Sequence, residues 1–160
     1  MDWGRRGLLV VAGFLAIPAQ AASTPSFSAY YDYDELGRII AQRGNNGQNV
    51  RYTYDLNGNV KTITDSLGRV TTMEYDALDR VIRSSDPLNQ VTQFKYDVGD
   101  RLIQVIDPRA LATSYSYDGL GQLWRQQSPD TGTTSFEYSS AGLRTRMTRN
   151  DGSSVTYGYD

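Results

Sequence analysis

The sequence of 160 residues contains no cysteine and no histidine. The chain therefore cannot form a disulfide, a Ser-His-Asp or Cys-His nucleophile system, or the usual zinc sites built from these residues. Proline is scarce, with 5 residues, and the formal net charge is only −2. Because both signs of charge are spread along the chain, no basic stripe is available to bind nucleic acid. These absences argue against common hydrolases, zinc proteins and nucleic-acid-binding proteins.

Tyrosine, by contrast, is abundant, and one tyrosine recurs every 21 residues without drift. A fixed period of this size indicates a stacked array of repeats. The next residue is aspartate throughout, except that Ser139 follows Tyr138. The repeated tyrosines are Tyr33, Tyr54, Tyr75, Tyr96, Tyr117, Tyr138 and Tyr159.

The residues before each tyrosine alternate between two chemical types. Thr92, Phe94 and Tyr96 enclose the polar Gln93 and Lys95, and the other repeats follow the same scheme. Since successive side chains of a strand point to opposite faces, this pattern predicts strands with an aromatic face and a polar face. If the aromatic face forms a buried core, replacing Phe94 or Tyr96 with alanine should cost about 3–5 kcal/mol.

Each tyrosine is followed by a turn signal of the form Asp-x-x-Gly. Aspartate at the first position and glycine at the fourth are typical of a type I turn that closes a bulged hairpin. Asp79 and Asp100 stand at the glycine position, and aspartate tolerates the left-handed conformation. The expected structural residues, beside the tyrosines, are Asp34, Gly37, Asp55, Gly58, Asp76, Asp97, Asp118, Gly121 and Gly142.

A second strand is predicted after each such turn, at residues 38–40, 59–61, 80–82, 101–103 and 122–124. A second turn follows, at 86–87, 107–108, 128–129 or 151–152. Every period is thus two antiparallel strands and two turns. In the last repeat the apolar residue of segment 142–147 stands one place earlier, which predicts a local change of register or a bulge.

The complete phrase, Tyr-Asp-x-x-Gly-Arg-Leu/Val, an Asp-Pro turn and then Thr-x-Phe/Tyr-x-Tyr-Asp, resembles the YD-repeat or rearrangement hot spot family. This resemblance covers residues 31–160, about six repeats that are open at the C-terminal end. The family includes bacterial polymorphic toxins, shell components of insecticidal Tc toxins and animal teneurins. The resemblance implies an all-β fold of tandem antiparallel β-hairpins, forming a curved, spiralling sheet that is a fragment of a hollow shell.

The N-terminus has the parts of a secretory signal peptide. Arg5 and Arg6 precede a short apolar run that ends in Ala19-Gln20-Ala21. We expect a signal peptide over residues 1–21, a linker over 22–30 and the repeat array over 31–160. The alternative is an N-terminal anchor that stays in place. Cleavage after Ala21 would give a secreted, periplasmic or cell-surface protein without stable membrane insertion.

No catalytic, cofactor-binding or metal-binding residue is predicted. Most aspartates occupy copied turn positions, whereas a catalytic pair should be unique. Arg38, Arg80 and Arg101 are expected to pair across the turn with Asp34, Asp76 and Asp97, rather than to bind a ligand. The self-cleaving members of the family carry an Asp-Pro-x-Gly-apolar motif, which the segments 86–88 and 107–109 lack.

The resemblance implies a non-catalytic scaffold, a segment of a shell that encapsulates or presents a toxin or effector. Its partners would be further YD repeats, a partner shell chain or an enclosed toxin domain. The alternative is a cell-surface adhesion or carbohydrate-binding module, in which the tyrosine rows stack on sugar rings. Binding to a glycan array would separate the two hypotheses. We also expect the isolated array to associate through its unpaired edge strands.

Overall fold

The computed structural model describes residues 6–9 and 27–160, and the described residues form 14 strands and no helix. This confirms the prediction of an all-β fold. The predicted signal peptide and linker fall mostly outside the described residues. The exceptions are β1 (Arg6–Leu9), which pairs antiparallel with β2 (Ala29–Tyr33), and the residues from Phe27 onward.

The strands divide between two compact units. Unit 1 contains residues up to Asp79 together with Asp86–Leu88, and unit 2 contains Arg80–Ser85 and Asn89–Asp160. In unit 1 each strand, from β1 to the last of the unit, pairs antiparallel with the next one in the chain. Its strands after β2 are β3 (Ile39–Gly44), β4 (Asn49–Tyr54), β5 (Val60–Thr64) and β6 (Val70–Tyr75).

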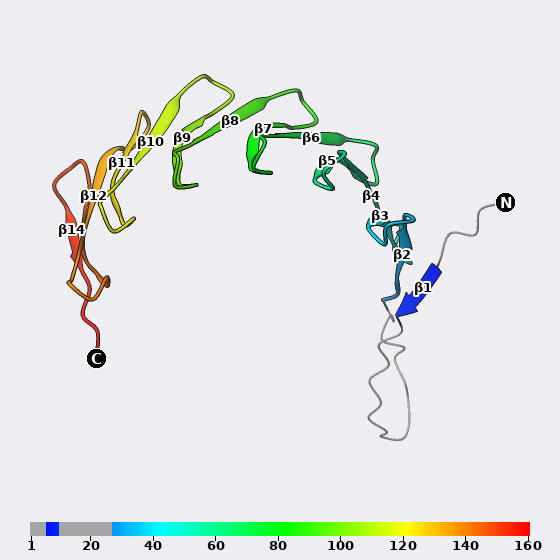
Figure 1. The fold of residues 1–160 in the computed structure, drawn as a ribbon, viewed down its shortest axis with the longest axis horizontal. Helices are drawn as coiled ribbons and strands as arrows, with labels where there is room; N and C mark the ends of the chain where they lie inside the picture. The colour runs from blue at the N-terminus through cyan, green and yellow to red at the C-terminus, as the bar shows by residue number, and fades with distance from the viewer. Residues whose placement is uncertain (1–5, 10–26) are drawn as a thin grey trace. The chain divides into compact units, whose positions relative to one another are not determined.

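Unit 2 is built in the same way. Its consecutive strands form antiparallel hairpins, so the unit is one meander in a single layer (Figure 1). The strands are β7 (Val81–Ser85), β8 (Val91–Tyr96), β9 (Leu102–Ile106), β10 (Ala112–Tyr117), β11 (Leu123–Ser128), β12 (Gly132–Tyr138), β13 (Arg144–Thr148) and β14 (Ser154–Thr156).

The turn after each tyrosine, which we call the first turn, has the predicted geometry. At Asp34 the Gly37 amide donates to the Asp34 carbonyl at 3.0 Å, and Gly37 has φ of 78°. Asp79 and Asp100 take the same left-handed conformation, with φ of 59° and 63°. The strand register shifts by one residue at the tyrosine, which is the bulge expected of such a hairpin.

The last repeat has a bulge between Glu137 and Tyr138, so the prediction of a bulge is confirmed, and its register is otherwise that of the other repeats. Tyr138 pairs with Arg144 just as Tyr117 pairs with Leu123, and both hairpins carry the bulge at the tyrosine. The exchanged order of leucine and arginine in the sequence therefore changes the positions of the two side chains and not the pairing of the strands. Leu143 takes the place that arginine holds in other repeats, and Arg144 lies with its guanidinium carbon 4.5 Å from the centre of the Phe136 ring.

The opposite turns, which we call the second turns, repeat the same backbone conformation. The Ala110 amide donates to the Asp107 carbonyl at 2.9 Å, and Ala110 has φ of 62°. Asn89 has φ of 60° at the equivalent place. The sequence indicated turns at these positions but not their geometry, because neither Asn89 nor Ala110 is the glycine that a left-handed residue normally signals.

The alternation of the two faces is confirmed in β4, β6 and β8, whereas in β10 every residue is half-buried, and the expected core is not found. In β8 the side chains of Phe94 and Tyr96 are half-buried, whereas Gln93 and Lys95 are exposed. Among the described residues the only buried hydrophobic residue is Ala41, at 8% exposure. Each unit is one layer, so the aromatic face is sheltered only by neighbouring side chains. The expected cost of 3–5 kcal/mol for Phe94→Ala is therefore too high, and about 2 kcal/mol follows from half-burial.

Candidate functional site

The repeated tyrosines form a row of identical hydrogen bonds. From Tyr54 onward, each hydroxyl donates to the backbone carbonyl 15 residues earlier, at the start of the preceding strand. Because the hydroxyl is hydrogen-bonded, burying the ring leaves no polar group without a partner. The same bond joins two neighbouring strands at one end. The pairs are Tyr54 to Ile39, Tyr75 to Val60, Tyr96 to Val81, Tyr117 to Leu102, Tyr138 to Leu123 and Tyr159 to Arg144, at 2.6–2.9 Å.

The aspartates close the first turns. Oδ1 of Asp97 accepts hydrogen bonds from the amides of Gly99 and Arg101 at 2.8 and 3.0 Å, and Oδ2 accepts from Arg101 Nε at 2.7 Å. Asp34 and Arg38 are arranged in the same way. The predicted cross-turn pairs of Arg38 and Arg101 are thus confirmed.

The arginines also reach forward into the next repeat. The guanidinium carbons of Arg38, Arg80 and Arg101 lie 4.4–5.1 Å from the ring centres of Tyr54, Tyr96 and Tyr117. Nη1 of Arg80 additionally donates to the Asp97 carbonyl at 3.3 Å and lies 2.7 Å from Asp100 Oδ1. Each contact of a cation with a ring contributes about 0.5–1 kcal/mol at such exposed sites. One arginine therefore couples two successive repeats.

The first turn that lacks an aspartate is also the one that lacks an arginine nearby. A first turn keeps its aspartate wherever its own repeat or the preceding one supplies arginine at the position of Arg38, Arg80 and Arg101. The turn at Ser139 has neither, because its own residue is Leu143 and the preceding one is Gln122. There the serine hydroxyl accepts a single long hydrogen bond, 3.3 Å from the Leu143 amide. The one first turn without an aspartate among residues 34–143 is thus also the one without an arginine in either place.

This correlation predicts an energetic coupling between the two positions. Gln122→Arg should stabilise the Ser139→Asp variant by about 0.5–1 kcal/mol more than it stabilises the wild type, as expected of a partly exposed ion pair. Urea unfolding of the four proteins in a double-mutant cycle measures this term. Gln127→Arg, at the other end of β11, is the matched control and should show no coupling. Equal effects of Gln122→Arg in both backgrounds would contradict the assignment.

Six turn aspartates have lowered pKa values, namely Asp34, Asp55, Asp65, Asp97, Asp107 and Asp151. The pKa of Asp97 is lowered first by the hydrogen bond from the Arg101 side chain and then by the Arg101 amide. The pKa of Asp107 is lowered chiefly by the Leu111 amide, and that of Asp34 by the Arg38 amide. In each case the folded protein favours the charged carboxylate.

These shifts predict loss of stability in acid. Because the folded pKa lies below the ordinary value of 3.8, the contribution is complete above that value. It is lost as the pH falls through the lower, folded pKa. Urea midpoints should therefore fall steadily between about pH 4 and pH 2.5, and Asp97→Asn should flatten part of this fall. A midpoint that stays constant from neutral pH to pH 2.5 would contradict the role of the carboxylates.

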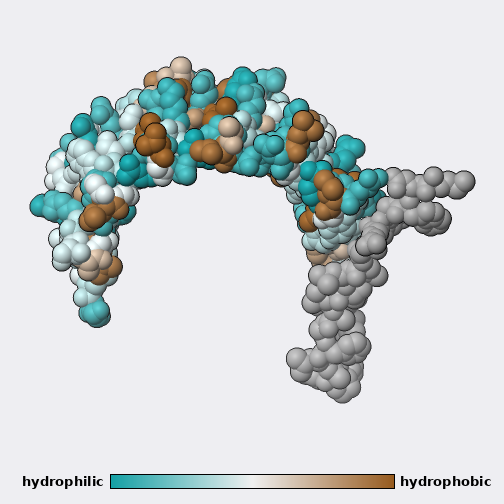
Figure 2. Space-filling view, viewed as in Figure 1, coloured by the Kyte–Doolittle hydropathy of each residue, from teal (hydrophilic) through white to brown (hydrophobic). Residues whose placement is uncertain are grey.

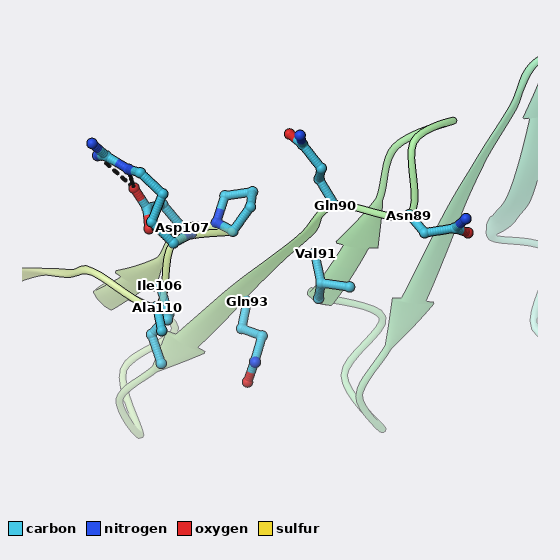
Figure 3. A pocket seen from close by; sticks show the side chains of 9 residues that line it. Asn89, Gln90, Val91, Gln93, Ile106, Asp107 and Ala110 are labelled. Atoms are coloured by element: carbon cyan, nitrogen blue, oxygen red, sulfur yellow. Dashed lines mark hydrogen bonds and ion pairs between the residues drawn. The ribbon is translucent and has the colours of Figure 1, made fainter.

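A shallow groove of about 680 Å³ lies on unit 2, between the second turns beside β8 and β9 (Figure 3). Arg109 at one side donates to Asp107 at 2.7 Å and to Asp130 at 2.6 Å, so its charge is already paired. Figure 3 shows the side chains of Gln90 and Gln93 pointing in opposite directions. No aromatic ring lines the groove. It therefore offers neither converging polar groups nor a stacking platform for a sugar ring.

The part of the chain that the structure describes contains no group of three or more acidic residues placed to hold a metal ion. No helix in that part is long and apolar enough to cross a membrane. The predicted structural residues are brought together at the first turns, where they bond to one another and to the backbone. The arrangement joins successive repeats.

The sequence reasoning missed one surface feature. Large aliphatic side chains stand at the centres of seven turns. Figure 2 shows hydrophobic residues scattered among hydrophilic ones on the face in view. A signal for them was present, because turn centres normally carry polar residues, glycine or proline. The residues are Leu36, Leu56, Leu67, Leu78, Leu88, Val98 and Leu120, each at least 65% exposed.

Comparison with known proteins supports the repeat architecture. The family model described as the teneurin YD-shell matches residues 18–160. No curated protein matches the sequence. Among solved structures, TcdB2-TccC3-Cdc42 is similar with a TM-score of 0.70 and 16% identity over 90% of this chain. The Photorhabdus luminescens Tc holotoxin pore is similar with a TM-score of 0.66 and 17% identity over 77%. The matches span only 8% and 7% of those chains.

Proposed function

Because the chain belongs to the teneurin YD-shell family, we propose that it is a non-catalytic wall segment of a hollow shell that encloses or presents a toxin or effector. The observation that carries this proposal is the repeated link at the first turns. The arginine reaches the tyrosine ring of the next repeat, the tyrosine hydroxyl bonds to the preceding strand, and the aspartate closes its own turn. Because these contacts recur, each unit is joined to its neighbours in the same way. Such a wall extends by adding repeats and needs no unique site.

The chemistry of the side chains supports a role without catalysis. The aspartates with lowered pKa values are turn residues bonded to amides or arginines, as at Asp34 and Asp107. The groove on unit 2 has a paired arginine and diverging amides. The similar structures are complexes of TcdB2 with TccC3 and a Tc holotoxin pore, which supports a partner shell chain and an enclosed polypeptide.

Protection of an enclosed polypeptide tests this function. The chain, purified under native conditions from its own cells, should bring with it a polypeptide that resists added protease. The proline variant of β9 described in the Discussion should open the wall and expose that polypeptide to cleavage. Equal digestion with the wild type and the variant, or the absence of any protected polypeptide, would contradict the role as a shell wall.

We further propose that the chain is exported by its N-terminal signal. The basic start, short apolar run and Ala-x-Ala ending support this route. Mass spectrometry of protein secreted by a bacterial host should show a mature start at Ala22 or Ser23. An intact Met1 on secreted protein would contradict cleavage of the signal.

A further inference from the structure

Two arginines on the polar face of unit 2 are not paired with a carboxylate. In the turns of this unit, Arg101 and Arg109 pair with aspartates at 2.6–2.7 Å. Arg125 in β11 and Arg146 in β13, by contrast, form no ion pair within the part of the chain that the structure describes. Their charges therefore remain available to an anion from outside the unit.

The charge of Arg125 is poorly compensated where it lies. The residue is half-buried, and its hydrogen bond within the described chain joins Nη2 to the neutral Oε1 of Gln127 at 3.2 Å. Its Nε is buried and has no hydrogen-bond partner among the described residues. A partly desolvated cation with one neutral acceptor is unfavourable, so a bound anion would stabilise it.

Hydroxyl groups flank this guanidinium. The strand register places Ser116 on one side of Arg125 and Ser135 on the other, each in a strand about 4.8 Å away. Thr148 continues the same row in β13. None of these three hydroxyls bonds to another described residue, so all three can donate to a ligand. A forked guanidinium beside free hydroxyls suits an oxyanion such as a carboxylate.

Arg146 sets the spacing that the anionic groups must have. It lies two strands beyond Arg125 and two residues along β13 from Thr148, so the two arginine Cα atoms are about 12 Å apart. Glu137 stands opposite Arg146 and weakens its attraction for anions, which leaves Arg125 as the principal contact. One small anion cannot reach both arginines. An extended polypeptide with carboxylates four residues apart spans about 13 Å and can.

We propose that the polar face of β10 to β13 binds an acidic stretch of the enclosed polypeptide, with Arg125 holding one carboxylate and Arg146 another. The inference rests on the proposed function, because it assigns a contact between the wall and its contents. The polar face of unit 2 would then line the inside of the wall. Charge complementarity selects the bound stretch, and the hydroxyls of Ser116 and Ser135 complete the contact at Arg125.

Fluorescence anisotropy of a labelled peptide with the full chain tests this contact. The peptide repeats Glu-Ser-Gly-Ser, so its glutamates stand four residues apart, and a Gln-Ser-Gly-Ser repeat is the uncharged control. Arg125→Gln should raise the Kd at least about tenfold, because a pair of charge-assisted hydrogen bonds is lost. Ser116→Ala with Ser135→Ala should raise it by a smaller factor. Urea midpoints of these variants should stay close to the wild-type value.

Arg51→Gln in unit 1 is the matched control. Arg51 is exposed on the polar face between Ala41 and Thr64, and its loss changes the net charge by the same amount. It should leave the Kd unchanged, and inorganic phosphate at the concentration of the peptide should not displace the peptide. Equal weakening by Arg51→Gln and Arg125→Gln, displacement by phosphate, or equal binding of the two peptides would overturn the proposal. None of these results decides the role as a shell wall, which protease protection tests separately.

Discussion

Tyr96→Ala is expected to destabilise unit 2 by about 3 kcal/mol. About 2 kcal/mol of this follows from removing a half-buried ring, and about 1 kcal/mol from losing its hydroxyl bond to the Val81 carbonyl. That bond measures 2.9 Å, and the Arg80 guanidinium lies over the same ring at 4.7 Å. The free energy from urea unfolding measures the change.

Two further variants test the contribution of the hydroxyl bond and the difference between the two faces of the strand. Tyr96→Phe keeps the ring and loses only the hydroxyl bond, so it should cost about 1 kcal/mol. Lys95→Ala, on the exposed face of the same strand, should change stability by less than about 0.5 kcal/mol. If Tyr96→Phe were neutral, the hydroxyl row would have no role in joining the strands. If Lys95→Ala cost as much as Tyr96→Ala, the two faces would not differ as described.

Val105→Pro is expected to cost 3 kcal/mol or more. Val105 lies in the middle of β9 and is paired on one side with Phe94 and on the other with Thr113. In a strand with neighbours on both sides, proline removes a ladder hydrogen bond and disturbs the backbone. Because the unit has no second layer to hold the strand in place, circular dichroism and urea unfolding should both show the loss.

The matched control places proline where the chain already uses it. Pro87 and Pro108 stand directly after the aspartate of their turns, and Val98 holds the same position after Asp97. Val98→Pro should therefore be neutral, or stabilise the fold by up to about 1 kcal/mol by restricting the unfolded chain. A Val105→Pro protein as stable as the wild type would contradict the pairing of β9, and a strongly destabilised Val98→Pro would contradict the geometry of the turn.

The elements that the sequence predicted correctly are those with local causes. Asp-x-x-Gly fixes a turn through bonds within five residues, as Asp34 shows with the amides of Leu36 and Arg38. Alternation along β8 follows from the pleat of a single strand. These features depend on neighbours in the chain, so one repeat is enough to infer them.

The features that were missed depend on residues in other strands. The target of the tyrosine hydroxyl, 15 residues away, requires the strand register. The second contact of Arg101, over Tyr117, requires the next repeat to be in place. The extent of burial was overestimated because periodicity shows which face is apolar but not whether anything covers it. The left-handed conformation of Ala110 was not predicted because alanine is not a residue type that indicates it.

Electron cryo-microscopy of the chain, purified natively from its own cells, tests the central claim most directly. The wall-segment account predicts a hollow particle whose wall is a single layer of strands about 4.8 Å apart, with these repeats inside that wall. It also predicts that Val105→Pro reduces the proportion of closed particles. A chain found only as an open, isolated ribbon, or packed in a solid particle without an internal space, would contradict the account.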